Sequence, residues 1–374
     1  MPDEDRVRPQ RRRGAAAVLV VAAAAGVAVG AFLAGSHQAG VTRATGAGHE
    51  RTRAATTWYP AGPLPAADAG PAAAPYFVNV VFQRSPVPVT VNAASTGRVL
   101  ATVRAPVAGI GFTGVAAAGD DRTFVLAAQE TKPLVVWFYE LRLSADGRVA
   151  SLTRLLSVKS AGVSAFAVSP DASRLAYGTA YGIRVVTLAT GASRSWNADG
   201  HTMVGTAAPL SWAGDQTLAL YWASVTPGSR QDGVRLLDTS VPGSDLLSSR
   251  LVIPVPEVTS FGKIDNLTDV LLTPDGSKVF ATAVSGLPDN PGAEVVEFSA
   301  RTGQPLAVVS PQAGESGMGT SCLALWTDPS GDQLTAECGE PGGGLVIAGG
   351  HWVAADLHVP SYNFSTGRQG FIGW

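Results

Sequence analysis

The sequence predicts an all-β fold, a β-propeller of six blades preceded by one transmembrane helix, with seven blades as the alternative. Tight-turn motifs near residues 119, 169, 213, 274 and 329 separate short apolar runs at intervals of 44 to 61 residues. This period suits blades of four strands each. The 43 Gly and 25 Pro are spread along the chain, and only 15% of the residues are charged, which is typical of many short strands joined by turns.

The first 75 residues divide into three predicted segments. Residues 1–13 contain five Arg and are expected to form a cytoplasmic tail. The apolar residues 14–35 are long enough to cross a bilayer as a signal anchor, and the excess of Arg before them predicts that the N-terminus stays inside. Residues 36–75 are rich in Ala, Gly and Pro, which predicts a disordered linker.

The remaining residues, 76–374, are assigned to the propeller domain. With the anchor retained, this domain is held at the cell membrane on the extracytoplasmic side of a single-pass protein. The alternative for residues 14–35 is a cleaved signal peptide, which would give a secreted protein. Both alternatives place the propeller outside the cytoplasm.

The strands of the propeller are predicted from a repeated hairpin unit. Its clearest copies are Val163–Trp196, Leu267–Val309 and Ser321–Cys338, in which apolar runs flank a turn of the Ser/Thr-Pro-Asp-Gly type. Pro presets φ in such a turn and Gly accepts a positive φ, so the chain reverses there. Residues 76–104 supply three strands of a first blade, and the apolar run 371–374 is expected to supply the fourth and so close the ring.

Three of these segments carry a family resemblance. SPDASRLAY, TPDGSKVFA and DPSGDQLTA resemble the repeats of TolB-type and WD40-like β-propellers. The resemblance covers roughly residues 76–374 and implies the fold, not an activity, because the matching residues are turn formers. Lys is rare and Arg common, as in proteins from high-GC genomes. Together with the predicted anchor, this makes the chain resemble the membrane-anchored propellers of high-GC bacteria.

The two cysteines are placed opposite each other by the predicted hairpin of the last repeat. Cys322 lies in one predicted strand and Cys338 in its partner, and the turn is centred midway between them. A disulfide is expected in an oxidising compartment, and the alternative is a pair of buried thiols. Two Cys without nearby His give too few ligands for a metal site.

No sequence motif predicts catalysis or a cofactor. Residues 109–114 match G-x-G-x-x-G, but no helix is predicted after them to bind a pyrophosphate. The segment Gly314–Met318 fails the G-x-S-x-G pattern at its last position. Residues 76–374 contain 24 acidic and 19 basic residues, and this mild acidity argues against a nucleic-acid partner.

The loops between the second and third strands of the blades are the predicted binding face. These b–c loops all emerge on one side of a propeller, and several are long, including 129–133, 224–233, 285–292 and 339–343. Functional groups concentrate on loops that a rigid scaffold positions. The candidate binding residues on this face are Glu130, Lys132, Tyr181, Trp222, Arg230, Asp232, Asp289 and Glu340.

The function predicted from these features is that of a non-catalytic binding or scaffolding module. Its expected partner is a protein, a peptide or a component of the cell envelope. One alternative is a propeller enzyme, either a lyase or a hydrolase that acts on glycans. Another is a sensory ectodomain that signals through a partner, because a tail of thirteen residues is too short to be a signalling domain.

Overall fold

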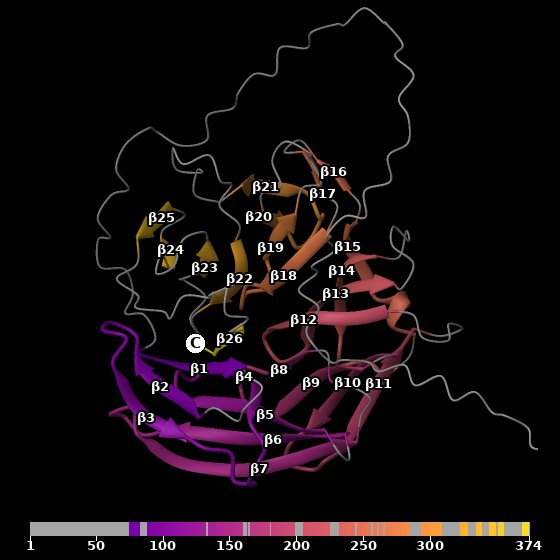
Figure 1. Ribbon diagram of the computed structural model, residues 1–374. Helices are drawn as coiled ribbons and strands as arrows, with labels where there is room; N and C mark the ends of the chain where they lie inside the picture. The colour runs from indigo at the N-terminus through magenta and orange to yellow at the C-terminus, as the bar shows by residue number, and fades with distance from the viewer. Residues whose placement is uncertain are drawn as a thin grey trace, which may run out of the picture.

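The computed structural model describes residues 75–373 apart from 83–87, 132–133, 160–162, 164, 180, 199–204, 225–231, 244, 256, 260–261, 265, 285–292, 309–321, 328–333, 339–343, 349–350 and 355–368. The described strands form antiparallel sheets of four strands arranged around a common centre, which is the architecture of a β-propeller (Figure 1). Neighbouring sheets contact each other through their innermost strands.

Blade 1 is completed by a strand from the far end of the chain. Its order is β26-β1-β2-β3, with β26 (Gln369–Gly373), β1 (Tyr76–Phe82), β2 (Val89–Ala93) and β3 (Val99–Val103). β26 runs antiparallel to β1, and Phe371 lies opposite Val80. The predicted pairing of the C-terminal apolar run with the first blade is therefore confirmed, although the strand begins two residues earlier than expected.

Blades 2 and 3 follow in chain order. Blade 2 consists of β4 (Phe112–Ala117), β5 (Thr123–Thr131), β6 (Leu134–Leu143) and β7 (Val149–Lys159). Blade 3 consists of β8 (Phe166–Val168), β9 (Arg174–Thr179), β10 (Gly182–Thr187) and β11 (Ser193–Asn197). Blade 2 has the longest strands, and its outermost strand, β7, is 11 residues long against 5 for β3 of blade 1.

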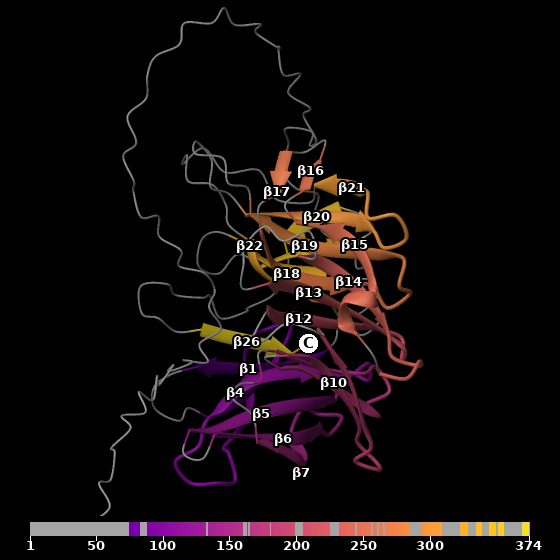
Figure 2. The same cartoon turned by 90° about the vertical axis from the view of Figure 1, so that its right-hand side faces the viewer.

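Blades 4 and 5 repeat the same order. Blade 4 consists of β12 (Gly205–Ala213), β13 (Thr217–Ser224), β14 (Gly233–Asp238) and β15 (Arg250–Pro254), with the 3-10 helix η1 (Leu246–Ser248) before β15. A two-stranded hairpin, β16 (Glu257–Thr259) and β17 (Gly262–Ile264), lies at the outer rim of the ring (Figures 1 and 2). Blade 5 consists of β18 (Asn266–Leu272), β19 (Lys278–Val284), β20 (Ala293–Ser299) and β21 (Pro305–Val308).

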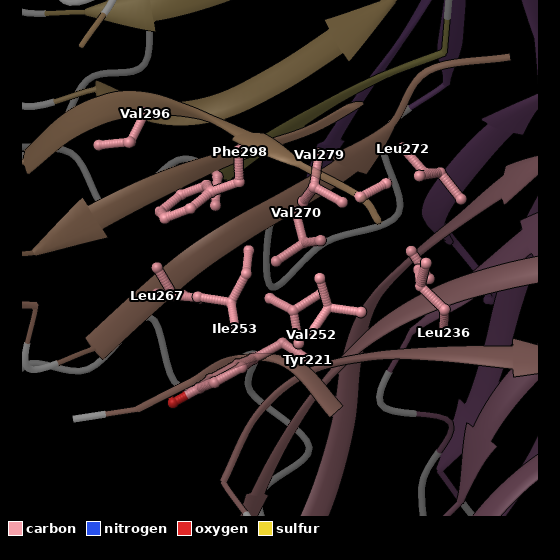
Figure 3. Close-up of a cluster of buried hydrophobic side chains, with 14 of the residues drawn as sticks. Tyr221, Leu236, Val252, Ile253, Leu267, Val270, Leu272, Val279, Val296 and Phe298 are labelled. Atoms are coloured by element: carbon pink, nitrogen blue, oxygen red, sulfur yellow. The ribbon is translucent and has the colours of Figure 1, made fainter. Parts of the chain in front are cut away.

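The hydrophobic core lies between the blades. Between blades 4 and 5, side chains of β13–β15 meet those of β18–β20, and Phe298, Val270 and Ile253 are almost fully buried there (Figure 3). In β13, Leu218 to Tyr221 are all buried because both faces of the inner strands are covered by neighbouring blades. The edge strand β7 contains no buried residue.

In blades 2 and 4, the loop between the third and fourth strands is hydrogen-bonded to the preceding blade. The Tyr76 hydroxyl of blade 1 donates to the Ala145 carbonyl of blade 2 at 2.5 Å. Arg194 of blade 3 donates from Nη1 to the carbonyls of Thr239, Ser240 and Val241 in blade 4, at 3.2, 2.9 and 3.3 Å. These contacts join residues that lie 45 to 69 positions apart in the chain.

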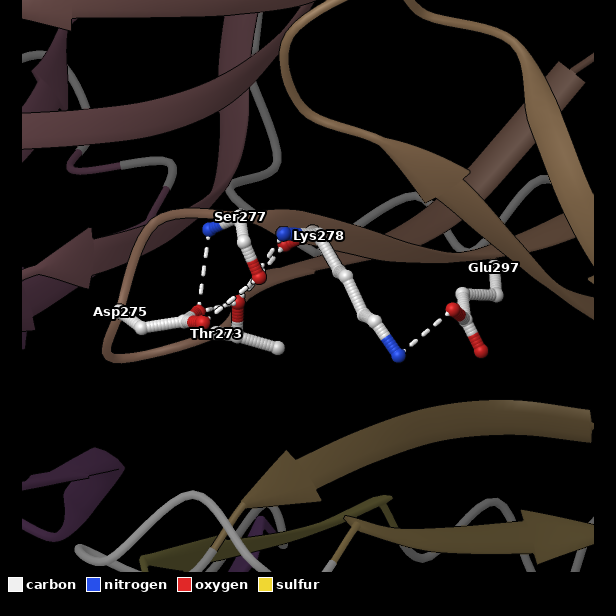
Figure 4. A network of polar contacts seen from close by, with 5 residues as sticks. All are labelled: Thr273, Asp275, Ser277, Lys278 and Glu297. Carbon is white, nitrogen blue, oxygen red and sulfur yellow. Dashed lines mark hydrogen bonds and ion pairs between the residues drawn. The ribbon is translucent and has the colours of Figure 1, made fainter. Parts of the chain in front are cut away.

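The Ser/Thr-Pro-Asp-Gly turns are held by their acidic residue, as Figure 4 shows for blade 5. Thr273 Oγ1 donates to Asp275 Oδ1 at 2.5 Å, and the Ser277 amide donates to the same oxygen at 3.0 Å. Beyond the turn, Lys278 Nζ pairs with Glu297 Oε1 at 2.9 Å. The hydrogen bond from Thr273, followed by those from Ser277, lowers the pKa of Asp275 to about 2.

This lowered pKa gives a pH-dependent contribution to stability. The ionised Asp275 is favoured in the folded state, so its contribution is present above the unfolded pKa of 3.8 and is lost as the pH falls towards 2. Asp275→Asn should therefore lower the free energy of unfolding at pH 7. The difference in this free energy between the variant and the unmodified chain should become smaller as the pH falls from 4 to 2. Urea denaturation at pH 7, 4 and 2.5 measures this difference, and a difference that stays constant would contradict the role given to the carboxylate.

The predicted fold class needs a correction. Packing of side chains between sheets is described for five blades, so the structure supports an all-β propeller with five blades and not the expected ring of six or seven. The described part of the chain contains no helix long and apolar enough to cross a bilayer, and residues 14–35 lie outside it. A turn motif reports a hairpin, whereas a blade is established by packing against its neighbours. The hairpin with its turn near residue 329 belongs to a sheet for which such packing is not described.

A further sheet is described by its backbone pairing alone. It consists of β22 (Cys322–Thr327), β23 (Leu334–Cys338), β24 (Gly344–Ala348) and β25 (His351–Ala354), and β22 contacts β18 of blade 5. Cys322 is the register partner of Cys338 across the β22–β23 hairpin, as the sequence predicted. Their backbone positions therefore allow the expected disulfide, which stays a prediction.

Candidate functional site

The candidate site is the upper face of the ring, which is formed by the b–c turns and by the connections from one blade to the next. Of the eight residues that the sequence assigned to this face, Glu130, Tyr181, Trp222 and Asp232 belong to the described part of the chain. The other four, Lys132, Arg230, Asp289 and Glu340, lie outside it. The structure therefore tests the position of half of the predicted set.

Glu130 belongs to a strand and not to a loop. The sequence placed residues 129–133 in a b–c loop, but β5 continues to Thr131 and β6 begins at Leu134. Glu130 is half-buried and pairs with Val135 across the hairpin. The error has a physical cause: long complementary strands in blade 2 extend the hydrogen-bonded ladder into polar residues that look like a loop in the sequence.

Tyr181 is presented to solvent by a short, well-held turn between β9 and β10. Its side chain is 60% exposed. Its backbone amide donates to Thr179 Oγ1 at 3.3 Å, and its carbonyl accepts from the Ala198 amide at 2.9 Å. An aromatic side chain on a fixed backbone can enter an interface with little loss of conformational entropy. The Tyr181 ring is therefore exposed on a turn whose backbone is held by hydrogen bonds.

Two other candidates belong to the scaffold of blade 4. Trp222 is only 1% exposed, because it packs between blades 3 and 4, so it is not available as a surface contact. Asp232 is 4% exposed, and its Oδ1 accepts a 2.7 Å hydrogen bond from the Ser224 amide. Ser224 ends β13 and Asp232 precedes β14, so this bond ties the two strands together at that edge. Asp232 therefore links β13 to β14, and the Trp222 side chain belongs to the core between blades 3 and 4.

Asp232 also influences the buried polar groups around it. Burial, followed by the nearby negative charge of Asp232, raises the pKa of Tyr221 to about 12, so this tyrosine is neutral at physiological pH. Burial lowers the pKa of Arg235, while Asp245 and Asp232 act in the opposite direction. Arg235 Nη1 donates to the carbonyls of Leu247 and Ser249 at 3.0 and 2.8 Å. These groups stabilise the loop around η1 and give no pair of titrating groups suited to acid–base catalysis.

The described residues contain no group of three or more His, Cys, Asp or Glu side chains that could hold a metal ion. The acidic side chains of the tight turns are occupied by their own turns, as in the bond from Thr123 Oγ1 to Asp120 Oδ2 at 2.6 Å. Of the four described candidates on the upper face, only Tyr181 is exposed.

A second surface feature was missed by the sequence analysis. On the outer part of blade 2, the guanidinium of Arg154 lies over the ring of Trp137, with Cζ 3.7 Å from the ring centroid. The two residues are 17 positions apart and belong to different strands of the β6–β7 hairpin. The signal that could have found them is the pairing of the two strands, since a tryptophan and an arginine then fall on the same face.

Comparison with known proteins supports the fold. No family model and no curated protein matches this sequence. Among solved structures, TolB from Acinetobacter baumannii is similar with a TM-score of 0.50 and 14% identity, over 81% of this chain and 68% of TolB. The Myceliophteria_thermophila Cps50 (Swd1) β-propeller domain has a TM-score of 0.47 and 12% identity, over 78% and 85% of the two chains.

The Dos1 propeller is a third structure of similar kind, with a TM-score of 0.42 and 13% identity over 73% of this chain and 66% of that chain. At these identities the likeness concerns the fold, and the resemblance to TolB-type propellers noted in the repeats agrees with it.

Proposed function

We propose that this protein is a non-catalytic binding or scaffolding module that docks a protein or peptide partner on the upper face of its propeller. The observation that carries the proposal is the exposed Tyr181 ring on a turn whose backbone is fixed by hydrogen bonds. Tyrosine is enriched among the few residues that dominate protein interfaces. The propeller supplies the rigid scaffold on which such a residue is useful.

Other parts of the expectation rest on the sequence alone. A location outside the cytoplasm is part of the proposal and is supported by the Arg-rich and apolar composition of residues 1–35. A cell-envelope component as the partner, a propeller enzyme and a sensory ectodomain stay predictions from the sequence.

The proposal predicts a loss of partner affinity when Tyr181 is truncated. Tyr181→Ala should weaken binding of a partner recovered by crosslinking about tenfold or more, as expected for an interface anchor. The stability should change little, because a side chain that is 60% exposed contributes little to the core. Affinity of the full chain for the recovered partner is measured by surface plasmon resonance, and the thermal midpoint by circular dichroism.

Val241→Ala is the matched control. Val241 is also an exposed apolar side chain, at 46%, but it lies in the loop between β14 and β15, on the face opposite to the b–c turns. The partner should bind this variant as it binds the unmodified chain. Equal affinity of the Tyr181→Ala variant and the unmodified chain would remove the upper face around Tyr181 from the proposal.

A further inference from the structure

Charge is distributed unevenly around the propeller. Residues 76–204, which include blades 2 and 3 and most of blade 1, contain 12 Lys and Arg but 7 Asp and Glu. Residues 205–374 contain 7 Lys and Arg but 17 Asp and Glu. One side of the ring is therefore basic although the domain as a whole is acidic, and an asymmetry of this kind favours an oppositely charged partner.

The basic side carries a defined patch on the outer part of blade 2. In the β6–β7 hairpin, Trp137 pairs with Ser157, and Val135 pairs with Lys159. Arg154 reaches the same face, since its guanidinium lies over the Trp137 ring and its Nη2 donates to Ser157 Oγ at 3.5 Å. These residues, Trp137, Arg154, Ser157 and Lys159, are called the Arg154 patch.

The positive charge of the Arg154 patch is not neutralised within the described structure. Arg154 and Lys159 are exposed, and neither forms an ion pair with a described carboxylate. Glu130 lies in the same cross-strand row, but Val135 stands between it and Lys159. Two strand spacings therefore separate the backbones of Glu130 and Lys159 by about 10 Å.

The patch is also accessible from outside the ring. Its strand β7 is more than twice as long as β3 of the neighbouring blade 1, and Trp137 is only partly buried at the margin of the core shared by blades 1 and 2. Both views show β7 at the periphery of the molecule (Figures 1 and 2). The cation–π contact holds Arg154 in place before any partner arrives, which lowers the entropic cost of binding.

We propose that the Arg154 patch docks an acidic segment of a protein partner, at a surface distinct from the Tyr181 turn. Tryptophan and arginine are the residue types most enriched at the centres of protein interfaces. Acidic side chains of the partner would pair with Arg154 and Lys159, while the edge of the Trp137 ring supplies apolar contact. This surface does not include Tyr181. A negative result for the Arg154 patch therefore does not contradict partner binding at the upper face, and a negative result for Tyr181 does not contradict binding at the patch.

A labelled acidic peptide tests the proposal with the full chain. Fluorescein-labelled deca-glutamate is titrated with the protein at low ionic strength, and fluorescence anisotropy gives the dissociation constant. Arg154→Ala and Lys159→Ala should each weaken binding about fivefold, whereas Arg98→Ala should leave it unchanged. Arg98 is an equally exposed cation in blade 1 between β2 and β3, away from the patch. Arg154→Lys should give an intermediate value, because it keeps the charge and loses the planar contact with Trp137.

The same experiment contains the results that would overturn the proposal. Equal losses in all three alanine variants would show that only the overall charge matters. Tighter binding of a labelled oligodeoxythymidine of the same charge would identify a nucleic acid as the preferred partner. Self-association of the chain in sedimentation velocity that Arg154→Ala abolishes would make a second copy the occupant. If Arg154→Ala lowers the thermal midpoint, Lys159→Ala still tests the proposal. The Lys159 side chain is exposed on an edge strand, so its truncation should not affect folding.

Discussion

Gly303→Ala is expected to destabilise the propeller by about 3 kcal/mol, by separating blades 4 and 5 at the outer rim. Gly303 has φ of +73°, and a Cβ atom added to it would lie 1.8 Å from the Val252 carbonyl oxygen. Val252 belongs to β15 of blade 4, so the clash is with backbone and cannot be relieved by a side-chain rotation. A hydrogen bond from blade 4 also holds this turn, since Arg250 Nη1 donates to the Arg301 carbonyl at 2.9 Å.

Gly191 provides a matched control for this prediction. It occupies the corresponding Thr-Gly turn of blade 3 with φ of +69°, but an added Cβ would meet nothing within 4 Å. Gly191→Ala should therefore cost only the strain of a left-handed residue, about 1 kcal/mol. Urea denaturation gives both free energies of unfolding, and their difference measures the contact between blades. Equal losses of free energy of unfolding in the two variants would mean that the turn at Gly303 does not contribute to the packing of blade 5 against blade 4.

Phe298→Ala is expected to have an effect of similar or larger size, about 3–5 kcal/mol. The Phe298 side chain is fully buried between blades 4 and 5, close to Val279 and Val270 (Figure 3). Its removal leaves a cavity that strands fixed in two sheets cannot close. A loss of this size is a large fraction of the stability of an ordinary domain.

Leu306→Ala in the same blade is the control for Phe298. Leu306 lies in the edge strand β21 and is 48% exposed, so its truncation should cost about 0.5 kcal/mol or less. Thermal and urea unfolding of the two variants compare a buried with an exposed apolar side chain in one sheet. A cost for Phe298→Ala as small as that for Leu306→Ala would contradict the packing of blade 5 against blade 4.

The candidate site was predicted from the sequence only in part. Tyr181 was identified because a b–c turn in a repeated unit is exposed by geometry. Trp222 and Asp232 were placed on the same face by the same reasoning, but both are buried. The sequence gives the position of a residue along a strand, whereas its burial depends on a neighbouring blade whose residues are distant in the chain. The Arg154–Trp137 contact was missed because it depends on the register of β6 against β7, which contains two irregularities.

The sequence by itself determined the features that arise from local chemistry. Turn residues such as Asp275 marked the hairpins, apolar runs marked the strands, and the C-terminal run was assigned correctly to the first blade. The same local logic placed Cys322 opposite Cys338. Only the tertiary structure decided which blades pack against each other, which candidate side chains reach solvent and that Arg154 lies over Trp137. The physical reason is that hairpins form from hydrogen bonds between residues close in sequence. Packing and exposure depend instead on contacts between sheets that are distant in the chain and meet only in the folded state.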